Sequence, residues 1–92
     1  MVDNNLPANL NASGVEFLLV EADTGLTFAD SALCSKDPDR IAFDRRNARA
    51  AYDTILRFVG RVGFSPGEAS ALHAKVARLK SKLVDLGEQF AT

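Results

Sequence analysis

Several residue types that often carry chemistry are scarce in this chain. Its 92 residues include one cysteine, one histidine, one methionine and no tryptophan. A single cysteine excludes an intramolecular disulfide and favours a reducing compartment, and with a single histidine it excludes a zinc site of the usual type within one chain. No apolar run approaches the ~18 residues of a membrane span. We therefore expect a cytoplasmic protein, bacterial or from another cytosol, that binds no metal and no membrane.

Enzymatic motifs are missing as well. The sequence contains no G-x-S-x-G elbow, no H-E-x-x-H zinc motif, no P-loop and no Rossmann glycine pattern. We expect His73 on a helix surface or bundle edge and Cys34 as a small, half-buried residue at the end of a helix. The sequence therefore predicts a protein that is not an enzyme and uses no cofactor.

The composition is that of an ordinary globular protein, with 47% hydrophobic and 25% charged residues. A chain of this length forms one domain with one core. The net charge of −1 is unevenly distributed, because residues 1–39 hold seven acidic residues and one lysine, whereas residues 40–61 hold six arginines and two aspartates. This pattern suits two neighbouring helices of opposite charge.

The first helix is predicted over residues 13–33, after a flexible, Asn-rich tail at residues 1–12. Ser13 and Glu16 have the spacing of a capping box, which would start the helix. Helical spacing of apolar residues continues for two turns past Gly25, which favours a helix over a strand. A stripe of small residues on this helix, with counterparts on the next, consists of Ala22, Gly25, Ala29 and Ala32, facing Ala48 and Ala51.

The second helix is predicted over residues 38–60. Asp37 suits the N-cap, and Pro38 suits the first helical position, where its missing N–H costs nothing. Gly60 or Gly63 would end the helix in a left-handed cap.

The third helix is predicted over residues 66–90, after a capping box formed by Ser65 and Glu68. Its apolar residues alternate at spacings of three and four up to Phe90, which is typical of a helix in a bundle. Because both connections are short, consecutive helices are antiparallel. The fold prediction is an all-α, antiparallel up-down-up three-helix bundle, with residues 13–92 as one domain. The predicted core is Leu18, Ala22, Leu26, Ala29, Leu33, Ala48, Tyr52, Ile55, Val59, Leu72, Val76, Leu79, Leu83 and Leu86.

Asp44 is unusual because it lies near the middle of the apolar face of the second helix. It is either a buried acid or an acid at the open end of the bundle, paired with Arg40 or Arg45. Acidic side chains are rarely buried without a partner, so we prefer the second interpretation.

An outward stripe on the second helix consists of Arg46, Arg49 and Arg57. Its charge is that of an anion-binding or nucleic-acid surface. Asp53 interrupts the stripe and has the spacing to pair with Arg57, and the pI of about 5.7 opposes nucleic-acid binding. We therefore prefer a solvated face that complements the acidic residues of the first helix, and keep nucleic acid as the alternative partner. Those acidic residues are Glu16, Asp23 and Asp30.

Four large apolar residues lie off the main helix faces: Phe17, Val20, Phe28 and Phe43. The first helix offers more apolar positions than one bundle seam buries. The apolar residues that this seam does not bury are covered by the third helix, by the tail or by a partner chain. The sequence therefore predicts a partner surface at these residues and self-association, as a homodimer, through the first helix.

Residues 47–58, NARAAYDTILRF, are similar to the second helix of tetratricopeptide repeats in the spacing of Ala48, Tyr52 and Ile55. Together with LHAKVARLKSKL in the third helix, they resemble microtubule-interacting-and-transport domains, which are three-helix bundles that bind peptide helices. The chain is also similar in style to small uncharacterised bacterial helical proteins. It departs from the tetratricopeptide pattern in its longer helices and its lack of the terminal proline. The resemblance implies a module for protein–protein interaction.

Overall fold

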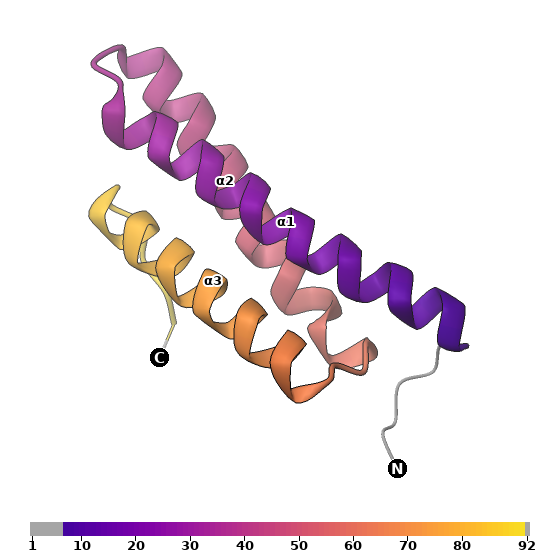
Figure 1. The fold of residues 1–92 in the computed structure, drawn as a ribbon. Helices are drawn as coiled ribbons and strands as arrows, with labels where there is room; N and C mark the ends of the chain where they lie inside the picture. Colours follow the sequence, from indigo (N-terminus) through magenta and orange to yellow (C-terminus); the bar gives the residue numbers. More distant parts are fainter. Residues whose placement is uncertain (1–6, 92) are drawn as a thin grey trace.

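The computed structural model describes residues 7–91, which form three α-helices lying along one another (Figure 1). α1 spans Ala8–Cys34, α2 spans Pro38–Phe58 and α3 spans Pro66–Asp85, and a short 3₁₀ helix, η1, follows α2 at Val59–Arg61. No strand occurs within residues 7–91. α1 and α2 are antiparallel, and α3 runs in the direction of α1. The predicted all-α three-helix bundle is therefore confirmed.

α1 begins at Ala8, five residues earlier than predicted. Ser13 consequently lies inside the helix, where its hydroxyl donates to the carbonyl of Asn9 at 3.3 Å instead of capping a helix start. The predicted capping box at Ser13 is therefore wrong, and residues 8–12 are helical. The part of the predicted tail at residues 1–6 lies outside the described residues.

The added first turns of α1 hold the connection between α2 and α3 in place. The Asn11 side chain accepts from the N–H of Gly63 at 2.7 Å and donates to its carbonyl oxygen at 2.9 Å. One amide thus pairs with both backbone groups of a loop residue 52 positions away. This contact positions the end of α2 beside the start of α1.

α2 begins as predicted but ends differently. The Asp37 carboxylate accepts from the N–H of Asp39 at 3.1 Å, and Pro38 occupies the first turn. At its end the helix tightens into the 3₁₀ turn η1, and neither Gly60 nor Gly63 has a positive φ. The predicted left-handed glycine cap is wrong, because a 3₁₀ turn satisfies the last carbonyls instead.

α3 has the predicted capping box, with the Ser65 hydroxyl accepting from the N–H of Glu68 at 3.2 Å and the Glu68 carboxylate accepting from the N–H of Ser65 at 2.9 Å. The helix ends at Asp85 rather than at residue 90. The reason is Gly87, whose φ of +97° lets the chain reverse.

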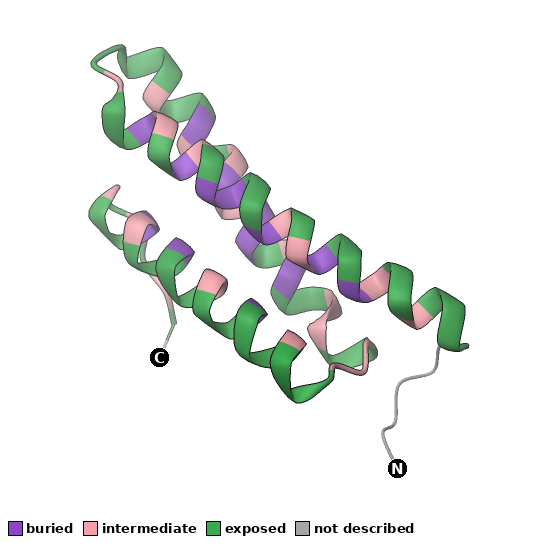
Figure 2. Ribbon diagram, in the orientation of Figure 1, coloured by how far each residue is buried: buried purple, intermediate pink, exposed green. Residues whose placement is uncertain are grey.

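Buried residues lie on the sides of the helices that face one another, and the outward sides are exposed (Figure 2). Leu18, Leu79 and Leu83 are fully buried. An added Cβ at Gly25 would lie 2.7 Å from Leu79 Cδ2 and 3.0 Å from Ala51 Cβ, so one of these buried side chains would have to shift. The predicted close approach at the small-residue stripe is therefore confirmed.

Four predicted core residues are not buried. Leu33 is exposed because it lies in the last turn of α1, level with the end of α3. Half-buried positions are Val59, Val76 and Leu86, and further buried apolar residues are Val15, Ala32 and Ala51.

Two ion pairs link α3 to α1. Lys75 Nζ lies 2.7 Å from Asp23, and Lys82 Nζ lies 2.8 Å from Asp30. Both partners advance by seven residues, as in parallel helices. The prediction that the arginines of α2 complement these acids is wrong, because lysines of α3 pair with them. Within residues 7–91, no helix combines the length and apolar character that crossing a bilayer requires.

Candidate functional site

The predicted partner surface lies along the outer side of the α1–α2 pair. Phe17 is 49% exposed, Val20 is 55% exposed and Phe43 is 46% exposed, whereas Phe28 is half-buried. Phe28 follows Phe17 by eleven positions, so the two share a side of α1 about 16 Å apart along its axis. We call this side of the pair the outer face, defined by Phe17, Val20, Phe28 and Phe43.

In one half of the outer face, two of the phenylalanine rings pack against each other. Phe28 and Phe43 pack edge to face, with ring centroids 6.2 Å apart. Phe28 also packs on the core cluster that contains Leu26 and Leu83. It therefore fastens α1 to α2, and only Phe43 remains substantially exposed here.

The other half of the outer face contains an apolar groove of about 480 Å³. We call it the Phe17 groove; its lining consists of Ser13, Gly14, Phe17, Leu18, Phe58, Arg61 and Val62. Three of these come from the end of α2 and its connection, and the sequence analysis did not identify them. Phe58 lies ten residues after Ala48. This spacing places it on the edge of α2 that faces α1, so the sequence carried a signal for its position.

Charged groups border this groove. The guanidinium of Arg61 lies 5.6 Å from the centroid of the Phe58 ring, and that of Arg57 lies 6.0 Å from it. Glu21 follows Phe17 by four residues and so lies one turn further along the same side of α1. Glu21 is not among the residues that line the groove, so the charged border of the groove is the basic one at the end of α2 and in η1.

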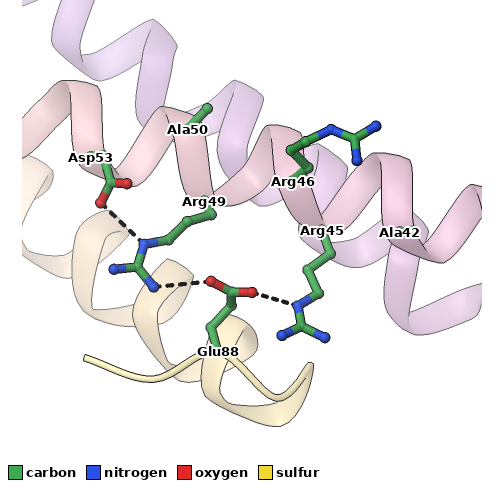
Figure 3. A pocket seen from close by; sticks show the side chains of 7 residues that line it. All are labelled: Ala42, Arg45, Arg46, Arg49, Ala50, Asp53 and Glu88. Atoms are coloured by element: carbon green, nitrogen blue, oxygen red, sulfur yellow. Dashed lines mark hydrogen bonds and ion pairs between the residues drawn. The ribbon is translucent and has the colours of Figure 1, made fainter.

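The arginines of α2 line a second groove of about 480 Å³, shown in Figure 3. Arg45 Nε donates to one carboxylate oxygen of Glu88 at 2.5 Å, and Arg49 Nη1 donates to the other at 3.0 Å. Arg49 also pairs with Asp53 at 3.1 Å, in place of the predicted Asp53–Arg57 pair. Arg46 points away from Glu88 (Figure 3).

These contacts shift two titration equilibria. The hydrogen bond from Arg45, followed by that from Arg49, lowers the pKa of Glu88 below its ordinary value. The hydrogen bond to Asp53, followed by that to Glu88, raises the pKa of Arg49. Of the predicted anion-binding stripe, Arg49 is therefore neutralised by carboxylates, while Arg46 and Arg57 are exposed and form no ion pair within residues 7–91.

Asp44 is buried, with 1% of its surface exposed. Its carboxylate accepts a hydrogen bond from the Ser31 hydroxyl of α1 at 2.5 Å and lies 3.9 Å from Arg40 Nη1. The preferred prediction of an acid at an open end of the bundle is wrong, although the pairing with Arg40 is present. A hydroxyl from the neighbouring helix satisfies the buried acid. No pattern in the sequence around Ser31 marks it as this donor.

Cys34 and His73, the side chains that could act as a nucleophile or an acid–base group, lie far apart. Cys34 is exposed at the end of α1, where a half-buried position was predicted. His73 is exposed, as predicted, and borders a groove between α2 and α3 near Leu56 and Val59, at the other end of α2. In the described part of the chain, no three His, Cys, Asp or Glu residues are grouped to hold a metal ion.

Comparison of the chain with protein-family models, with curated proteins and with solved structures finds no match in any of the three. The resemblance to tetratricopeptide and microtubule-interacting-and-transport modules therefore stays a prediction from residues 47–58 and the third helix.

Proposed function

We propose that this protein is a non-enzymatic interaction module that self-associates through the outer face of α1 and α2. The observation that carries the proposal is the Phe17 groove, where an exposed phenylalanine stands beside an apolar groove of about 480 Å³. Large exposed aromatic side chains at the mouth of an apolar groove are typical of protein–protein interfaces.

A second copy of the chain is the occupant we favour, because the groove is self-complementary. In a two-fold contact the same surface of each copy meets that of the other. A side chain that inserts into the groove of the partner copy must therefore lie close to the groove of its own copy. Phe17 projects at the edge of the groove that Phe58 and Val62 line.

Sedimentation equilibrium tests this proposal. The wild type is expected to form dimers at micromolar to high micromolar concentration, and Phe17→Glu with Val20→Glu is expected to be a folded monomer. Both residues are about half exposed, so their replacement leaves the core intact. Phe28 is left unchanged because it packs on the core.

The matched control is Val84→Glu, which places the same charge at a valine that is 54% exposed on α3. This variant is expected to dimerise like the wild type. A wild type that stays monomeric at high micromolar concentration would contradict the proposal, and so would equal weakening by Val84→Glu.

Nucleic acid is the rival partner, and exposed Arg46 and Arg57 are the residues that favour it. Binding of a fluorescent DNA duplex at low salt that falls steeply with added salt, and is lost in Arg46→Glu with Arg57→Glu, would support the rival. We expect no such binding, because Asp53 and Glu88 neutralise the middle of the stripe.

A further inference from the structure

Residues 87–91 follow α3 but lie against α2. Gly87 has a φ of +97°, and the N–H groups of Gly87 and Glu88 donate to the carbonyls of Val84 and Leu83, each at 2.9 Å. This Schellman arrangement ends the helix and turns the chain back. The segment that follows belongs to no helix, as Figure 1 shows beside the end of α3.

The first recognition contact in this segment is made by Glu88. Both of its carboxylate oxygens are used, one by Arg45 and one by Arg49 (Figure 3). Its side chain is only 18% exposed. Two arginines from successive turns of α2 therefore hold one carboxylate, which is the means by which proteins recognise an acidic residue in a peptide.

The next two residues are recognised by different means. Arg49 Nη1 donates to the backbone carbonyl of Gln89 at 2.9 Å, a contact that is independent of the side chain at this position. The Phe90 ring packs edge to face on Tyr52, with centroids 4.9 Å apart. The Arg49 guanidinium lies 4.3 Å from the Phe90 centroid, and Lys80 Nζ lies 5.2 Å from it.

We propose that this surface is a peptide-binding site for the sequence Glu-x-Phe, and that the chain's own Glu88 and Phe90 occupy it. We call it the Glu-x-Phe site, formed by Arg45, Arg49, Tyr52 and Lys80. The site binds the carboxylate of the first residue, the backbone carbonyl of the second and the aromatic ring of the third residue of a non-helical segment. It makes no contact that requires a particular side chain at the second position. The partner it fits is a protein segment with an acidic residue two positions before an aromatic one.

The hydrophobic cluster on which Phe90 packs is built by all three helices. Leu79, Leu83 and Ala48, which lie under the site, are fully buried and belong to a cluster that α1 supplies with Leu26 and Ala29. The site is separate from the Phe17 groove, so the test below is independent of self-association.

The test uses the full chain with Glu88→Ala and Phe90→Ala, which empties the site, and a fluorescent peptide with the sequence of residues 86–91, LGEQFA. Fluorescence anisotropy is expected to show saturable binding to this variant, and at least ~10-fold weaker binding to the wild type, where the tethered segment competes at a high effective concentration. Circular dichroism establishes that the emptied variant is folded.

Two matched controls define the site. In the emptied variant, Arg49→Ala is expected to abolish peptide binding, whereas Arg46→Ala, on the same helix but pointing away, is expected to leave it unchanged. A peptide with alanine in place of phenylalanine is expected not to bind. A folded, emptied variant that binds no peptide would overturn the proposal, as would equal effects of the two arginine substitutions.

Should the emptied variant fail to fold, the wild type itself provides the test. Addition of millimolar LGEQFA peptide to the isotope-labelled wild type is expected to displace the tethered segment and to shift the NMR signals of the Phe90 ring, which leaves Tyr52. Phe90 signals that stay unchanged at millimolar peptide would refute the proposal.

Discussion

Asp44 shows how a single buried acid is accommodated between two helices. It is 1% exposed and accepts from Ser31 across the α1–α2 interface, with Arg40 one turn away on its own helix. Because a buried carboxylate that loses its donor keeps its desolvation cost, the two residues depend on each other energetically.

A double-mutant cycle measures this dependence. Ser31→Ala and Asp44→Ala are each expected to lower the free energy of unfolding, and the pair is expected to cost less than the sum by ~1.5–3 kcal/mol, the range for hydrogen bonds to charged groups. Urea denaturation of the four proteins provides the values. Additive effects within ~0.5 kcal/mol would show that the hydroxyl does not stabilise the acid.

Gly25 gives the second prediction at this scale. Gly25→Ala is expected to destabilise the protein, because overpacking against Leu79 and Ala51 costs ~1–3 kcal/mol and outweighs the ~1 kcal/mol that alanine gains in helix propensity. The control is Gly67→Ala in α3, where an added Cβ meets nothing within 4 Å. Thermal unfolding that ranks Gly25→Ala at or above the wild type would disprove the close-approach interpretation.

Sequence reasoning located many buried residues but not their polar partners. The spacing of Leu18, Leu79 and Leu83 predicts burial because helical periodicity determines which side of a helix faces the core. The partners that come from other elements, Ser31 for Asp44 and Glu88 for Arg49, were not predictable, because they depend on how α1 and the segment after α3 lie against α2. Ser31 and Glu88 therefore became apparent only in the assembled bundle.

At the scale of elements, capping chemistry explains which helix ends were predicted correctly. Asp37 and Ser65 each precede a proline and form local hydrogen bonds, so both starts follow from neighbouring residues alone. The start of α1 was misplaced because its first turns are held by Asn11 and Gly63, a contact across 52 residues. The end of α3 was misplaced because Phe90 continues the apolar spacing although Gly87 has already ended the helix.

The segment after α3 makes stability depend on pH. The pKa of Glu88 is lower in the folded protein than in the unfolded chain, so its ion pairs stabilise the fold above the ordinary glutamate pKa. This stabilisation is lost as the pH falls through the folded-state pKa. We therefore expect Glu88→Gln to be less stable than the wild type at neutral pH, with a difference that shrinks in acid.

Denaturant unfolding of both proteins from neutral to acidic pH tests this expectation. A constant difference in unfolding free energy across that range would mean that the charge of Glu88 contributes nothing. Gln89→Ala is a suitable control, because only the backbone carbonyl of Gln89 is bound by Arg49.

At the scale of the whole molecule, α1 is the helix that holds the bundle together. It packs along α2 and α3, whereas α2 and α3 contact each other much less. Leu79 of α3 is fully buried in the cluster that contains residues of all three helices. The three-helix architecture was predictable because short connections and helical periodicity leave few alternatives.

Leu79→Ala is expected to lower the free energy of unfolding by ~2–5 kcal/mol, the range for truncating a buried leucine. The control is Leu56→Ala at a leucine that is 52% exposed, where a much smaller loss is expected. A denaturant midpoint for Leu79→Ala equal to that of the wild type would contradict the observed core.

The outer face of α1 and α2 is the whole-molecule feature on which the proposed function depends. Phe17, Val20 and Phe43 are each about half exposed, and the Phe17 groove beside them is apolar. Phe28, by contrast, is used inside the bundle, so part of the predicted partner surface serves the fold. Helical spacing carried a signal for Phe58, but Arg61 and Val62 were not predictable, because they reach the groove through the 3₁₀ turn that ends α2.

The most direct measurement is an isotope-filtered NOE experiment on an equimolar mixture of ¹³C-labelled and unlabelled chains at high micromolar concentration. Self-association through the outer face predicts NOEs between the Phe17 ring of one copy and the Val62 methyl groups of the other. Filtered spectra with no intermolecular NOEs, or with NOEs confined to α3, would contradict the proposed function.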